Sequence, residues 1–232
     1  MPYFPTEAWL EAYRRRLNDS EAFADLGAGW ARGFDGDVRY VITDLPVETT
    51  TLGDLPPGVL DGLPDHVRER VADVPLAEAP AAFDPIREGL PDDVVDRLDQ
   101  LERYAVDGTV HAHVGLEDGR CTDVEVLESP DEREAGFVLR GSYDVWRSIV
   151  DGRPSSSAVL SGDLAFEGNR VRRLRYAPMF GMLGDAAADV ETTHLFPAEE
   201  TPSQPVLDTA MRGRSLLERQ VHRRVKRTVD LL

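Results

Sequence analysis

The sequence is short of several features, and each shortage excludes a class of protein. Its 232 residues include one cysteine, Cys121, which excludes a disulfide framework within the chain and any cysteine-rich zinc or iron–sulfur site. No apolar run approaches the roughly 18 residues needed to span a bilayer. The N-terminus has no basic region followed by an apolar one, so no signal peptide is expected. We therefore expect a soluble, cytoplasmic protein.

Lysine is nearly absent as well. The sequence has one lysine, Lys226, and 25 arginines. Its 43 acidic and 26 basic residues give a formal net charge of −17. This acidic, lysine-poor composition resembles that of halophilic proteins, because molar salt shortens the Debye length to about 3 Å and lets like charges tolerate one another. An ordinary acidic protein from a GC-rich genome is the alternative. High salt weakens phosphate contacts, so no nucleic-acid partner is expected.

The residue patterns that are present predict an α+β protein. Five segments have the pattern of strands, namely 38–45, 109–116, 120–127, 135–141 and 161–168. Glu117-Asp118-Gly119, between the second and third of these, is a hairpin signal. Helices are expected within 6–34 in two parts, at Tyr143–Val150 and Ser155–Leu160, and from Asn169 onward with an interruption at Pro178.

Two segments lie outside this pattern. Residues 46–105 hold eight of the 16 prolines and have room for short helices at 64–73, 80–88 and 91–104, so we expect a helical insertion. It is either a lid over a site, or an interface or filler. Residues 197–205 are expected to be a linker, and 206–232 a basic amphipathic helix with a net charge of +4. The main domain is then 1–196.

The C-terminal helix has more than one use open to it. It can pack against the acidic body of the chain or join two copies into a homo-oligomer. A basic amphipathic helix is also typical of contact with anionic lipid headgroups. High salt weakens such contact, so at most a transient meeting with a membrane surface is expected.

One stretch carries a family resemblance. Residues 137–174 read FVLRGSYDVWRSIVDGRPSSSAVLSGDLAFEGNRVRRL, which is a strand, a helix ending in Asp-Gly-Arg, a short helix, and a strand with glycines near both ends. This order resembles the sterol carrier domain, also called the nonspecific lipid-transfer domain, over about residues 107–190. The lysines usual beside the two glycine turns of that family are Arg153 and Asp163 here.

The resemblance implies a five-stranded, mostly antiparallel sheet, covered on one face by helices around an apolar tunnel. Ligand binding in such a tunnel is driven by removing apolar surface from water, at roughly 25 cal/mol per Å². Its expected lining is Phe137, Leu139, Trp146, Ile149, Leu160, Leu164, Phe166, Leu174, Met179, Phe180, Met182 and Leu183. The same residues can instead fill a solid core, because periodicity does not separate a tunnel wall from a core.

No group of residues points to catalysis, a metal or a cofactor. His111 and His113 are two apart on a predicted strand and face the same way, but no third ligand has a diagnostic spacing. Cys121 has no partner base in any sequence signature. We therefore predict a non-enzymatic carrier of a lipid, isoprenoid or quinone. The alternatives are a solid-core self-association module that uses the C-terminal helix and, less favoured, an acyl- or isoprenoid-processing enzyme.

Overall fold

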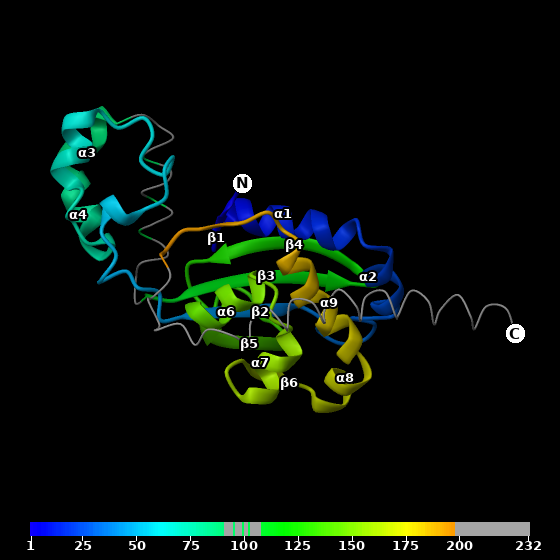
Figure 1. Cartoon of the computed structure of the whole chain (residues 1–232). Helices are drawn as coiled ribbons and strands as arrows, with labels where there is room; N and C mark the ends of the chain where they lie inside the picture. Colours follow the sequence, from blue (N-terminus) through cyan, green and yellow to red (C-terminus); the bar gives the residue numbers. More distant parts are fainter. Residues whose placement is uncertain (91–94, 96–98, 100–101, 103–107, 198–232) are drawn as a thin grey trace, which may run out of the picture. The chain divides into compact units, whose positions relative to one another are not determined.

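The structure is a computed structural model that describes residues 1–90, 95, 99, 102 and 108–197 (Figure 1). Residues Met1–Pro197 form one compact unit, and the description below concerns this unit. The expected helix at 206–232, nearly all of the linker and most of the helix at 91–104 lie outside the described residues. In the part that is described, no helix has the length and apolar character needed to cross a membrane.

The centre of this unit is a five-stranded sheet with the order β4-β3-β2-β5-β6. Its strands are β2 (Val38–Thr43), β3 (Val110–Glu117), β4 (Arg120–Leu127), β5 (Phe137–Ser142) and β6 (Ala165–Gly168). The β2–β5 pair is parallel and the other three pairs are antiparallel. The predicted α+β class with a mostly antiparallel five-stranded sheet is confirmed.

The pairing of a second, two-stranded ladder was not predicted, although the sequence favours an extended chain over residues 191–196. β1 (Tyr3–Phe4) pairs in parallel with β7 (Thr193–His194), which ties the start of the unit to its end. Strands of two residues carry no periodicity, so the sequence offers no alternation that would reveal them.

Hydroxyl side chains cap the first turn of some of the described helices. α1 (Glu7–Asn18) begins after Thr6, and α6 (Tyr143–Val150) begins after Ser142, each side-chain oxygen accepting a backbone N–H of the first turn. The others are α2 (Glu21–Leu26), α3 (Asp65–Val71), α4 (Ala79–Phe83), α7 (Ser155–Ser161), α8 (Arg170–Arg175) and α9 (Ala177–Ala188), with 3-10 turns at Leu52–Asp54, Leu76–Glu78 and Asp84–Gly89.

The predicted interruption near Pro178 occurs at Tyr176, which separates α8 from α9. Proline lacks an N–H and clashes with the preceding turn, so it fits the first turn of a helix better than its interior. The chain therefore breaks before the proline, and α9 starts anew with Pro178 in its first turn. Because of this break, α8 is free to present a different face from α9.

The helices cover one face of the sheet. Tyr40 and Ile42 of β2, Ala112 of β3 and Leu139 of β5 share that face and are buried. α1, α6 and α9 bury their apolar stripes against it, led by Trp9, Leu10 and Tyr13, then Trp146 and Ile149, then Phe180 and Leu183. This layer arrangement places three helices and four strands around one apolar space.

The β3–β4 hairpin closes through Asp118 and Gly119, both with positive φ (48° and 77°), as a two-residue turn of this kind requires. A Cβ on Gly119 would overlap the backbone of Ala24. Gly33 has nearly the same φ, 76°, but no described atom lies within 4 Å of its Cβ position.

We expect Gly119→Ala to lower the free energy of unfolding by about 2–4 kcal/mol, since backbone strain and a clash act together. Gly33→Ala, its matched control, carries only the strain and is expected to lose about 1 kcal/mol. Urea unfolding followed by circular dichroism measures both. Equal losses of unfolding free energy in the two variants would show that the clash with Ala24 does not contribute to the destabilisation.

Candidate ligand pocket

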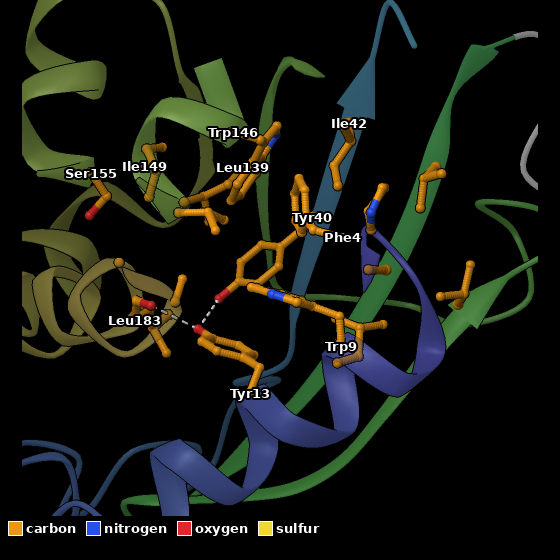
Figure 2. A pocket seen from close by; sticks show the side chains of 18 of the residues that line it. Phe4, Trp9, Tyr13, Tyr40, Ile42, Leu139, Trp146, Ile149, Ser155 and Leu183 are labelled. Atoms are coloured by element: carbon orange, nitrogen blue, oxygen red, sulfur yellow. Dashed lines mark hydrogen bonds between the residues drawn. The ribbon is translucent and has the colours of Figure 1, made fainter. Parts of the chain in front are cut away.

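An apolar pocket lies between the helix layer and the sheet (Figure 2). α1, α6 and α9 form one side, β2 to β5 form the other, and Phe4 and Pro5, which precede α1, also line the space. The lining residues are Phe4, Pro5, Trp9, Leu10, Tyr13, Tyr40, Ile42, Val110, Ala112, Val126, Leu139, Trp146, Ile149, Val150, Ser155, Phe180, Leu183, Gly184 and Ala187.

No charged side chain stands among these described lining residues, and the side-chain hydroxyls are those of Tyr13, Tyr40 and Ser155. A pocket of this composition binds by removing apolar surface from water, with a few polar groups to orient the occupant. It has no group with which to neutralise a buried carboxylate or phosphate.

The pocket is narrow. It offers about 30 Å³ to the centre of a water-sized sphere, within about 570 Å³ of space that atoms do not fill, part of it open to solvent. Since roughly 10–15 Å³ of centre volume holds one water molecule, this void matches about two waters. A lipid-sized occupant therefore requires the helix layer and the sheet to move apart.

Two tyrosines form the polar centre of the pocket. The hydroxyl oxygens of Tyr13 and Tyr40 are 2.9 Å apart, and the Tyr13 hydroxyl donates to the backbone carbonyl of Leu183 at 3.1 Å. Figure 2 shows both hydroxyl groups pointing toward one another, between α1, β2 and α9. Because Tyr13 donates to Leu183, the hydrogen between the two rings comes from Tyr40. Both hydroxyl hydrogens are then engaged in hydrogen bonds, and the lone pairs on the Tyr40 oxygen remain able to accept one from a ligand.

Burial keeps this pair neutral. Desolvation raises the pKa of Tyr13 well above its ordinary value, and the proximity of Tyr40 raises it further. Desolvation also raises the pKa of Tyr40, and the hydrogen bond with Tyr13 lowers that pKa by a smaller amount. A neutral hydroxyl pair can bind a polar end of a ligand, but it has no charge with which to hold an ion.

The two pocket tryptophans present only their rings to the space. The indole N–H of Trp9 donates to the hydroxyl of Thr192 at 2.8 Å, and that of Trp146 donates to the backbone carbonyl of Val41 at 3.1 Å. Their polar atoms are thus satisfied outside the pocket, and their apolar surface is left to face an occupant.

The structure brings together some of the residues proposed from the sequence as tunnel lining. Leu139, Trp146, Ile149, Phe180 and Leu183 line the pocket. The others do not. Phe137, Leu164 and Met179 are buried in the surrounding core, Phe166 and Met182 are partly buried against it, and Leu160 and Leu174 are exposed.

Leu160 and Leu174 lie on the surface because of helix register. Their exposed fractions are 88% and 80%. α7 turns Ala158 inward, so Leu160, two residues later, faces away. Leu174 belongs to α8, which is separated from α9 by the break at Tyr176. Neither leucine takes part in this pocket.

The wall that sequence reasoning missed comes from α1 and β2. Trp9, Leu10 and Tyr13 recur at helical spacing, and Tyr40 and Ile42 alternate along a strand. Both patterns are visible in the sequence, but they mark a buried face without saying that a cavity lies against it. The segment resembling a known family supplies α6, α9 and β5 on the same two sides of the pocket, and the lining was therefore sought there.

Two other candidate groups noted in the sequence, His113 and Cys121, are buried outside the pocket lining. Among the described residues, no group of three or more histidine, cysteine or acidic side chains could hold a metal ion. His113 is fully buried with Asp37 at 3.4 Å. Burial raises the pKa of the Cys121 thiol to about 12, despite Arg14 nearby, so the thiol stays protonated at neutral pH.

Comparison with known proteins found similarity at the level of solved structures. The crystal structure of sterol carrier protein 2 superposes with a TM-score of 0.47 and 20% identity, covering 80% of this chain and 97% of that one. The solution structure of a conserved hypothetical protein from Thermus thermophilus gives a TM-score of 0.47 and 19% identity, covering 81% and 90%. No protein-family model and no curated protein sequence matches the chain.

Proposed function

We propose that this protein binds and carries an uncharged hydrophobic small molecule, such as a lipid, an isoprenoid or a quinone, and performs no chemistry on it. The observation that carries the proposal is the pocket between α1, α6, α9 and the sheet, whose described lining is apolar apart from the hydroxyls of Tyr13, Tyr40 and Ser155. Ordinary solid cores are also apolar, but they leave few voids larger than a water molecule, whereas this pocket has space for about two waters.

We propose a carrier that catalyses no reaction because the buried thiol and hydroxyl groups are protonated and not activated as nucleophiles. The Cys121 thiol has its pKa raised to about 12 by burial, which is the opposite of an activated nucleophile. The pocket tyrosines are kept neutral by burial and bonded to one another. Such groups can orient a ligand, and none of them is set up to attack one.

Uptake of a neutral fluorescent probe tests the proposal. N-phenyl-1-naphthylamine is added to the full chain in 2 M KCl, because we infer from the composition that the protein works at high salt. We expect saturable enhancement of its emission at one site per chain, and displacement by hexadecane or hexadecan-1-ol. A probe that stays dark, with no displacement by either, would contradict the carrier.

The narrow void favours one other function, a solid-core self-association module. In that case the protein would take up no probe, and its elution volume in 2 M KCl would correspond to an oligomer. Size-exclusion chromatography beside the uptake assay separates the two functions, because a carrier is expected to bind the probe whatever its oligomeric state.

The tyrosine pair predicts a preference within the uncharged ligands. Because both hydroxyl hydrogens are already donated, Tyr40 can accept a hydrogen bond from a ligand but has none to give. A lipid alcohol fits this need. We expect Tyr40→Phe to weaken binding of hexadecan-1-ol about tenfold, as loss of one hydrogen bond to a buried hydroxyl predicts.

Hexadecane is the control for that variant, since it makes no hydrogen bond and its affinity is expected to change less than twofold. Displacement of the probe measures both ligands. If the alcohol and the alkane weaken by the same factor in Tyr40→Phe, the tyrosine pair has no part in recognition, while the carrier proposal still stands.

A further inference from the structure

The surface of the unit has one feature that the pocket does not explain, the short helix α8. Its sequence is RVRRLR, so four of its six residues are arginines, in a chain with a net charge of −17. Val171 and Leu174 lie three residues apart, which puts them on one face of the helix. Their exposed fractions are 77% and 80%. Large aliphatic side chains that are this exposed, beside clustered positive charge, are typical of a surface that binds a protein or a membrane.

A hollow of about 660 Å³ opens beside this helix. Three arginines and two aromatic rings contribute to its wall, together with Val171, and no acidic residue does so among those described: the residues are Arg32, Phe34, Arg172, Arg175 and Tyr176. The hollow is therefore basic and partly apolar, unlike the pocket between the helices and the sheet.

The guanidinium of Arg32 is paired with the Asp118 carboxylate at 3.1 Å, whereas those of Arg172 and Arg175 contact aromatic rings. That of Arg172 stacks over the Phe34 ring at 4.0 Å, and that of Arg175 lies 5.4 Å from the centre of the Tyr176 ring. Ring contacts fix a guanidinium through its face and leave the N–H groups at its edge free to bind an anion. Within the described ranges, no ion pair joins an arginine of α8 to a carboxylate.

We propose that α8 and the adjoining hollow dock the protein on an anionic phospholipid surface. The arginines bind headgroup phosphates, and Val171 and Leu174 enter the boundary between headgroups and acyl chains. The positive charge and the apolar side chains of this surface then both contact the membrane. A nucleic acid would use the arginines but would leave the two aliphatic side chains in water, and it is therefore the poorer fit.

Charge also decides against the chain's own C-terminal segment as the occupant. Residues 206–232 carry a net charge of +4, which α8 would repel. The docking surface has a further consequence for the proposed carrier. α9, which supplies Phe180 and Leu183 to the pocket wall, begins directly after α8 and Tyr176. A bilayer bound at α8 would lie against the helix that has to move when the pocket opens.

Vesicle flotation of the full chain tests the proposal. Vesicles of phosphatidylcholine and phosphatidylglycerol in equal parts are compared with phosphatidylcholine alone, in 0.1 M KCl. We expect binding to the mixed vesicles only, and weaker but still measurable binding in 2 M KCl, where salt screens the charges while the two aliphatic side chains still enter the bilayer boundary. Each basic residue near such a surface changes the affinity by roughly five- to sixfold. The double variant Arg172→Gln with Arg175→Gln is therefore expected to weaken binding about thirtyfold.

Two further variants complete the test. Arg223→Gln with Arg224→Gln makes the same charge change in the C-terminal segment, and we expect it to change binding less than threefold. Val171→Ser with Leu174→Ser keeps the charge and is expected to weaken binding at least fivefold. The proposal is overturned if the mixed vesicles do not bind the protein. It is also overturned if the C-terminal pair alone abolishes binding, or if the α8 pair alters only the oligomeric state.

This docking can fail independently of the carrier function. Uptake of N-phenyl-1-naphthylamine in solution needs no bilayer, so the α8 variants are expected to retain it within twofold. A protein that takes up the probe and ignores anionic vesicles would refute the docking surface and leave the carrier intact. Loss of probe uptake in the unaltered chain would instead refute the carrier.

Discussion

Replacing Ala112 by phenylalanine is expected to reduce uptake of a neutral lipid probe at least tenfold. Ala112 is buried on β3 and lies in register between Tyr40 on β2 and Val126 on β4, and all three line the pocket. A phenyl ring at this position projects into the void that a ligand must widen. Overpacking costs about 1–3 kcal/mol, and about 1.4 kcal/mol is already a factor of ten in affinity. Displacement titrations with N-phenyl-1-naphthylamine measure the change.

Ala165→Phe is the matched control. It makes the same substitution on strand β6, where the alanine is exposed and lies outside the pocket. We expect its uptake to stay within twofold of the unaltered chain. Should Ala112→Phe fail to fold, Ala187→Leu provides a milder obstruction from α9. Folded Ala112→Phe and Ala187→Leu proteins that bind the probe normally would place the binding site elsewhere.

Trp30→Ala is expected to lower the free energy of unfolding by about 3–5 kcal/mol, the range for a large buried aromatic. Trp30 is fully buried, and its indole N–H donates to the Gly36 carbonyl at 2.8 Å. Its ring lies 4.9–5.3 Å from four other aromatic rings, those of Phe34, Phe137, Tyr176 and Phe180. The loss is a large part of the roughly 5–15 kcal/mol that is usual for a whole domain.

Trp30→Phe separates this stability role from the pocket. It keeps a ring in the cluster but leaves the Gly36 carbonyl without its donor, and it is expected to cost about 1–3 kcal/mol. Since Trp30 does not line the pocket, probe uptake by the folded Trp30→Phe protein should match that of the unaltered chain. Urea unfolding followed by circular dichroism gives both stabilities. A cost below about 1 kcal/mol for Trp30→Ala would mean that the aromatic cluster is not a centre of the fold.

Much of the fold could be predicted, because its signals are local. The strand Arg120–Leu127 and the helix Tyr143–Val150 occur with the bounds expected from the sequence. The Asp118-Gly119 turn needs two residues that tolerate positive φ, and few pairs other than these satisfy that need. Pro178 could only stand in the first turn of a helix, so the break before α9 followed from covalent structure.

The pocket could be predicted only in part. Trp146 and Phe180 were expected in its wall, whereas Trp9 and Tyr40 were not. Hydrophobic periodicity tells which face of an element is buried. It does not tell whether the space opposite is filled, because that depends on how side chains of distant elements fit together to within an ångström. Leu174 shows the reverse case, since its apolar side chain meets no core.

The measurement that tests the central claim most directly is mass spectrometry of an organic extract of the protein, purified in molar KCl from a halophilic host. The account predicts one uncharged lipid, isoprenoid or quinone per chain, held in the pocket around Tyr13 and Tyr40. The same extract from Ala112→Phe is expected to contain at least tenfold less of it. An empty extract from a protein that also leaves N-phenyl-1-naphthylamine dark would contradict the account and favour a solid-core interaction module.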